Sequence, residues 1–132
     1  FAFYALHGRM MAREAAGQPA YLRDMYGKVV ELCNDGNVYC NITTFDHANQ
    51  AVNELWTEAL LNATKAGSVD GVFADHGSAN PTPVASGDYA QMCNGRGAGR
   101  RCFNFTLDFA ERFTAGHEWL LNHTQDVLAK ST

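Results

Sequence analysis

The sequence has little positive charge and no long apolar stretch. Its 132 residues carry 10 Lys and Arg against 14 Asp and Glu, which gives a formal net charge of −4. Arg96, Arg100 and Arg101 form the only basic cluster, and nucleic-acid binding needs a basic face. We therefore expect no nucleic-acid partner. No apolar run approaches the ~20 residues that span a bilayer, so we expect no membrane span either.

Motifs of common metal and nucleotide sites are also missing. No two cysteines have the C-x-x-C spacing of a zinc site or a thioredoxin motif. The glycine-rich segment 94–101 lacks the Lys-Ser/Thr ending and the strand–helix context of a phosphate loop, so we interpret it as a surface loop. We expect no cofactor. The chain begins at Phe1 without an initiator Met or a signal peptide, and Thr132 directly follows a helical pattern, so we expect a piece of a longer protein.

Four glycosylation triplets and an even number of cysteines indicate a secreted or luminal eukaryotic protein. The N-x-[ST] acceptors are Asn41, Asn62, Asn104 and Asn122. Disulfides persist in the same oxidising compartments. Three pairings are open to the four cysteines, Cys33, Cys40, Cys93 and Cys102, and we favour Cys93–Cys102 because it closes a loop.

Hydrophobic spacing predicts a βαβ unit over residues 38–75. Apolar residues recur at helical intervals from Ala48 to Ala63, including Ala51 and Trp56, and Gly67 supplies a stop signal. Short runs at 38–42 and 70–75 have the composition of strands, and a helix between two strands favours a parallel pair. Residues 77–102 are predicted to be a long loop. Helices are predicted over residues 1–16 and 106–130.

Two Asp-His pairs follow these predicted strands. Asp46-His47 precedes the first clear helix, and Asp75-His76 follows the strand 70–75. Ligand sites of parallel sheets lie at the carboxyl ends of the strands, so we expect both pairs in one cleft. Two carboxylates there would suit glycoside hydrolysis, one as nucleophile or base and the other as acid.

Structural alternatives remain for each of these residues. Asp46 stands where a helix N-cap belongs, and His47 would then be a solvated residue of the first turn. Asp75 has the alternative of a loop cap or a structural ion pair. Tyr4, with His7 nearby, is a candidate for a sugar subsite, and core packing explains it equally well.

The segment Gly67-Ser-Val-Asp-Gly-Val-Phe-Ala-Asp75 after a helix resembles part of many (β/α)8 glycosidases. Residues 39–46 and 102–109 are similar to a group of secreted glycoside-hydrolase-like proteins. The resemblance implies a TIM-barrel-like α/β fold, of which 1–132 would be a partial domain, since a complete barrel needs about 250 residues. It assigns Asp75 as the strand-end carboxylate that acts as nucleophile or binds the substrate, with Asp46 opening the preceding helix. The partner carboxylate would lie beyond Thr132, so this chain alone would be inactive.

Three functions follow from these patterns. The first is a segment of a secreted hydrolase of O-glycosidic bonds, with a carbohydrate substrate, Asp75 as catalytic residue, and Asp46, His47, His76 and Tyr4 in substrate binding. The second is a carbohydrate-binding or degenerate protein without catalysis. The third is a metal-dependent hydrolase that uses His7 and the two Asp-His pairs as ligands, although their spacing matches no known ligand motif.

Overall fold

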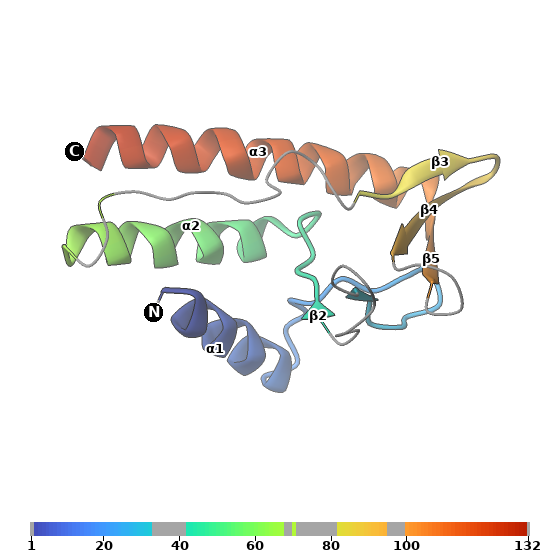
Figure 1. Ribbon diagram of the computed structural model, residues 1–132, viewed down its shortest axis with the longest axis horizontal. Helices are drawn as coiled ribbons and strands as arrows, with labels where there is room; N and C mark the ends of the chain where they lie inside the picture. The colour runs from blue at the N-terminus through green and yellow to red at the C-terminus, as the bar shows by residue number, and fades with distance from the viewer. Residues whose placement is uncertain (1, 33–41, 68–69, 71–81, 95–99, 132) are drawn as a thin grey trace.

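The computed structural model describes residues 2–32, 42–67, 70, 82–94 and 100–131. In this part of the chain it contains helices α1 (Ala2–Ala15), α2 (Gln50–Lys65) and α3 (Leu107–Ser131). A three-stranded sheet consists of β3 (Val84–Ser86), β4 (Tyr89–Asn94) and β5 (Arg101–Thr106). A two-stranded pair consists of β1 (Glu31–Leu32) and β2 (Ile42–Thr43). In Figure 1, α2 lies between α1 and α3, and the larger sheet lies beyond the start of α3.

This arrangement is a small α+β fold, and the predicted partial (β/α)8 barrel is wrong. Every strand pair among the described residues is antiparallel, and the three-stranded sheet is open. The predicted βαβ unit is wrong because β2 pairs antiparallel with β1, and because α2 packs on the other helices. Its helix is confirmed as α2, which ends before Gly67 at a φ of 69°. Residues 38–41 and 71–75 lie outside the described residues, so the second predicted strand is not described.

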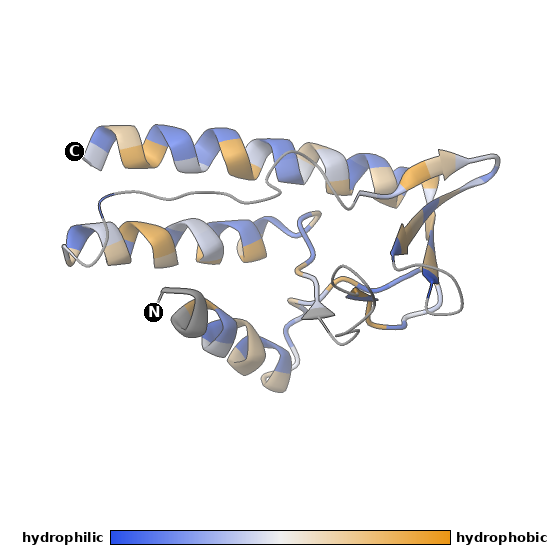
Figure 2. Ribbon diagram, in the orientation of Figure 1, coloured by the Kyte–Doolittle hydropathy of each residue, from blue (hydrophilic) through white to orange (hydrophobic). Residues whose placement is uncertain are grey.

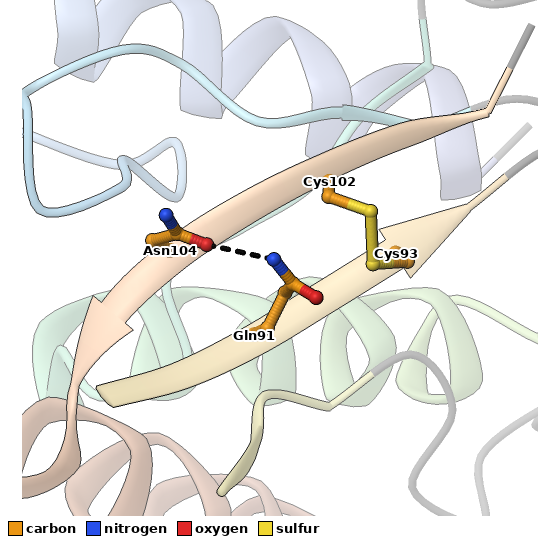
Figure 3. Close-up of a disulfide and its surroundings, with 4 residues drawn as sticks. All are labelled: Gln91, Cys93, Cys102 and Asn104. Carbon is orange, nitrogen blue, oxygen red and sulfur yellow. Dashed lines mark hydrogen bonds between the residues drawn. A yellow bond between two sulfur atoms is a disulfide. The ribbon is translucent and has the colours of Figure 1, made fainter. Parts of the chain in front are cut away.

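The predicted loop 77–102 contains strands instead. β3 and β4 form a hairpin in which Ser86 pairs with Tyr89, leaving a two-residue turn at Gly87-Asp88. Gly87 has a φ of 71°, which glycine adopts without strain and which tight hairpin turns require. The favoured disulfide Cys93–Cys102 is confirmed, and it joins residues directly opposite on β4 and β5 (Figure 3).

Alternation along β4 and β5 gives the sheet one buried and one polar face. Ala90, Met92, Phe103 and Phe105 point to the interior, whereas the disulfide and a hydrogen bond from Gln91 Nε2 to Asn104 Oδ1 (3.0 Å) lie on the other face (Figure 3). The buried face packs on the segment 22–32 and on the first turns of α3. The members of this first cluster are Leu22, Val30, Leu32, Ala90, Met92, Phe103, Phe105, Ala110 and Phe113.

A second apolar cluster joins α1 to α2. Leu6, Met10, Ala20 and Val52 are buried in it, and Trp56 packs against them. The predicted helix 1–16 is confirmed as α1. Figure 2 shows hydrophobic and hydrophilic bands alternating along α2 and α3, as expected for helices with one buried face. The predicted stripe of α2 is confirmed at Val52, but Ala51 is exposed.

The helix predicted over 106–130 is confirmed as α3, and it packs parallel to α2. Thr106 Oγ1 accepts a hydrogen bond from Phe109 N and caps the start of α3. Phe113, Leu120 and Thr124 are buried on its inner face. Between α2 and α3, Thr57 Oγ1 lies 3.1 Å from Thr124 Oγ1. No helix in the described part of the chain is long and apolar enough to cross a membrane.

The closest approach between α3 and the turn before α2 depends on Gly116. A Cβ atom built on Gly116 would overlap the carbonyl oxygen of His47 and would lie 3.4 Å from Ala48 Cα. Both neighbours are backbone, so neither can move away as a flexible side chain would. The absence of a side chain at this position therefore allows α3 to reach the turn.

We predict that Gly116→Ala lowers the free energy of unfolding by at least about 2–3 kcal/mol, because the added methyl overpacks a backbone contact. Gly8→Ala is the matched control, since Gly8 lies in α1 with open space around its Cβ position. Alanine there should raise stability by up to about 1 kcal/mol through helix propensity. Urea unfolding of both variants measures the difference, and equal effects would contradict the close approach.

Candidate functional site

The turn at residues 46–49 connects β2 to α2 and carries the first Asp-His pair. Asp46 N donates to Ala20 O (2.9 Å), and Asp46 Oδ1 accepts from Ala48 N (3.0 Å). The N-cap of α2 is Asn49, whose side chain accepts from Ala51 N (3.1 Å). The capping alternative for Asp46 is therefore wrong, because the helix begins after Asn49. The Asp46 side chain instead stabilises the turn by accepting from the backbone N–H two residues later.

A buried asparagine holds this turn against both helices. Asn53, on α2, is 1% exposed. Its Nδ2 donates to His47 O (3.0 Å) and to Gly116 O on α3 (3.1 Å). Its Oδ1 lies 2.9 Å from His47 Nδ1. One amide thus joins α2, the turn and α3, and both of its ends have partners, as a buried amide requires.

These contacts fix the protonated nitrogen of His47. Two carbonyl oxygens can be satisfied only by the Nδ2 end of Asn53, so its Oδ1 must face the imidazole. His47 Nδ1 is then the N–H donor, and in the neutral ring Nε2 keeps its lone pair. In its neutral form, His47 therefore carries its proton on Nδ1 and has Nε2 as an acceptor.

The surroundings of His47 favour that neutral form. The ring is partly buried, with Phe113 at 5.6 Å and His117 at 5.2 Å between ring centroids. Burial lowers the pKa of His47, and the nearby His117 lowers it further, while the hydrogen bond to Asn53 acts in the opposite direction. Burial also lowers the pKa of His117. The expectation of a solvated His47 is wrong.

A pocket of about 280 Å³ opens beside this imidazole. One wall comes from the turn and the start of α2, and the other from the middle of α3. Trp119 lines the pocket on α3. Its indole stacks on the imidazole of His123, with 4.4 Å between the ring centroids. No Asp, Glu, Lys or Arg is among the described lining residues, which are His47, Ala48, Gln50, Asn53, Ala115, Gly116 and Trp119. Its chemistry is that of an aromatic face, an imidazole and amide groups.

No family model, curated protein or solved structure matches this chain. The function therefore has to be argued from the site.

Asp46 is not among the residues that line this pocket, and it lies near two arginines. Burial raises the pKa of its carboxyl, while the Ala48 N–H, Arg112 and Arg23 act to lower it. Arg23 and Arg112 line a smaller hollow of about 150 Å³ with Phe109. Arg112 is also paired with Asp108 (3.0 Å), and Arg23 with Glu14 (2.9 Å). A carboxyl with a raised pKa is the form that a general acid needs.

Several predicted site residues lie outside the described residues. They are Asp75, His76, Asn41, Cys33 and Cys40. That the two Asp-His pairs lie in one cleft therefore stays a prediction. Tyr4 and His7 belong to α1, a different helix from those that line the pocket. Within the ranges that the structure describes, no three His, Cys, Asp or Glu side chains converge as metal ligands.

The glycosylation acceptors differ in their surroundings. Asn62 on α2 and Asn122 on α3 are exposed, so a glycan has access to both. Asn104 on β5 is partly buried and its Oδ1 accepts from Gln91. These exposures support glycosylation at the two helical sites more than at the strand.

The sequence prediction missed Asn53, Gly116, His117 and the pocket role of Trp119. Two local signals existed. Asn53 lies between apolar residues of α2, directly after Val52. Gly116 interrupts a long helix, where glycine costs stability unless close packing needs it. Asn53 and Gly116, which face each other across the two helices, lie 63 positions apart, so the pocket itself left no local pattern.

We predict that Asn53→Ala lowers the free energy of unfolding by about 2–4 kcal/mol, since it leaves two carbonyls and the His47 N–H without their partner. Asn62→Ala is the matched control, because Asn62 is an exposed asparagine on the same helix. It should change stability by less than about 0.5 kcal/mol. Denaturant unfolding of protein made without glycans compares them, and similar losses would contradict the bridging role.

Proposed function

We propose that this chain is the sugar-binding part of a secreted glycoprotein, and that the pocket beside His47 and Trp119 holds an uncharged sugar. The observation that carries the proposal is the combination of an indole face with a neutral imidazole acceptor in one small pocket. Aromatic rings supply apolar contact area, and a few placed polar groups fix the orientation of a ligand.

The size and polarity of the pocket support this ligand class. At about 280 Å³ it lies just under the ~300 Å³ lower end of typical ligand pockets, so it suits a single sugar residue better than a larger molecule. His47 Nε2 is an acceptor for a hydroxyl, and Gln50 adds an amide at the rim. The described lining offers no fixed charge to balance an anionic or cationic ligand.

Secretion is supported by two separate features. The Cys93–Cys102 disulfide is of the kind that persists in oxidising compartments. Asn62 and Asn122 present glycosylation triplets on exposed helix positions. Together they support a protein that passes through the secretory pathway.

Saturation-transfer NMR with glucose, galactose, mannose, N-acetylglucosamine and their short oligomers tests sugar binding by the purified chain. We expect one or more of these sugars to bind, and Trp119→Leu to weaken that binding at least about tenfold, the equivalent of ~1.4 kcal/mol of lost contact. Gln125→Ala, at an exposed position on α3, is the control and should bind as the wild type does. A folded wild type that binds none of them, or a Trp119→Leu variant with unchanged affinity, would refute the proposal.

Hydrolysis of O-glycosidic bonds is a second candidate function, favoured by Asp46. Its carboxyl is partly buried and has a raised pKa, as a general acid requires. A second carboxylate would have to come from residues outside those described, and Asp75 remains the predicted candidate.

The protein should release reducing sugar from a glycan panel if it is such a hydrolase. We expect Asp46→Asn to lower the turnover number about 100-fold or more, because it removes the proton donor. Asp88→Asn, at an exposed hairpin turn, is the control and should leave turnover unchanged. Turnover that survives Asp46→Asn would show that this carboxyl is not the acid.

A further inference from the structure

We propose that the contact between the turn at 46–49 and α3 is an acid-sensitive latch, closed while His47 is neutral and loosened when His47 is protonated. This proposal concerns the state of the junction itself and does not depend on which ligand the pocket holds. It rests on the hydrogen bonds of Asn53, on the close approach at Gly116 and on the pair of imidazoles.

The backbone of His47 is closely packed at this junction. The His47 carbonyl lies where a side chain at Gly116 would be, and its oxygen accepts from Asn53 Nδ2. The imidazole of the same residue is bound to the other end of that amide. Movement of the ring toward solvent therefore displaces the Asn53 amide, whose Nδ2 also donates to Gly116 O.

The groups that face His47 come from both helices, and burial and His117 outweigh the hydrogen bond to Asn53, which favours the protonated ring. On α2, Gln50 and Asn53 are uncharged amides. On α3, Phe113 and Trp119 are apolar, and His117 adds a second basic ring, while Glu118 acts on His117. In its own turn, the carboxyl of Asp46 interacts with Arg23 and Arg112. Among the described residues, no carboxylate acts on His47 to compensate a positive charge.

The sign of the pH dependence follows from these surroundings. Burial and His117 lower the pKa of His47 from 6.5, so the unfolded chain binds protons more readily than the folded one. The contribution of the neutral ring to stability is fully present above pH 6.5 and is lost as the pH falls through the lowered pKa. His117 acts in the same direction. Asp46, with its raised pKa, acts in the opposite direction.

Loosening of the junction would take the pocket apart. His47 and Ala48 form one wall, and Gly116 and Trp119 form the facing wall, so the two sides of the latch are also the two sides of the pocket. The strands β4 and β5 are joined by the Cys93–Cys102 disulfide and by their antiparallel pairing, and His47 takes no part in that pairing. Acidification should therefore affect the α2–α3 junction before the sheet.

Two NMR measurements on the whole chain test the latch between pH 7.5 and 5. The His47 Hε1 signal should titrate with a midpoint below 6.5. Hydrogen-exchange protection factors of Val52 and Asn53 should fall by up to about tenfold per pH unit per histidine, while those of Met92 and Phe103 on β4 and β5 fall less. A His47 midpoint at or above 6.5, or an equal loss at both places, would overturn the proposal.

Variants separate the latch from general acid unfolding. His47→Gln should make the protection of Asn53 depend less steeply on pH in this range, leaving only the part that His117 contributes. If that variant does not fold, His117→Gln should make the dependence shallower by removing the neighbouring basic ring. His123→Gln, on the same helix but stacked on Trp119, is the control and should keep the wild-type profile. An unchanged profile in His117→Gln, or an equal change in His123→Gln, counts against the latch. Because none of these measurements uses a sugar, their outcome is separate from that of the binding experiment.

Discussion

The side-chain amide of Asn53 is the interaction on which the arrangement of the helices depends. An amide buried to this degree costs several kcal/mol if it lacks partners, and here each end has them: two carbonyls at Nδ2 and an imidazole at Oδ1. Apolar contacts between helices tolerate some sliding, but this set of three hydrogen bonds has one geometry. It sets the depth of α3 against the turn, the orientation of His47 and the shape of the pocket. The hydrogen bond between Thr57 and Thr124 is a further polar contact between α2 and α3.

A second polar centre fixes the segment that follows α1. The carboxylate of Glu14 accepts from the backbone N–H groups of Ala20 and Tyr21 and pairs with both terminal nitrogens of Arg23. The hydrogen bond from Arg23 is the main reason that the pKa of Glu14 falls to about 2. This carboxylate holds the segment after α1 in an extended path, so that Leu22 enters the cluster under the sheet. The two apolar clusters are thus tied together by charged and amide groups, which specify one arrangement where apolar packing alone would permit several.

Sequence periodicity identified the three helices, because helical repeats are long and each helix has one buried face. It failed on the sheet. A short apolar run is consistent with more than one type of strand, and the parallel interpretation came from its position between a helix and two polar residues. The turn Gly87-Asp88 is a recognised two-residue hairpin signal, and the polar composition around it concealed the strands. The disulfide could be predicted because the spacing of Cys93 and Cys102 is local. The pocket could not, since Asn53 and Gly116 are 63 residues apart in the chain.

The position of Gly116 explains why the pocket lies where it does. Glycine inside a helix costs about 1 kcal/mol relative to alanine, and α3 has this residue near its middle, within reach of His47. That loss is offset by the contact it allows, in which a backbone carbonyl of the turn takes the place of a side chain. Gly116 also lines the pocket, together with Trp119 on α3 and with His47 and Ala48 of the turn. The residues of the close contact are therefore also residues of the pocket wall, and the binding surface and the junction of the helices form one structural unit.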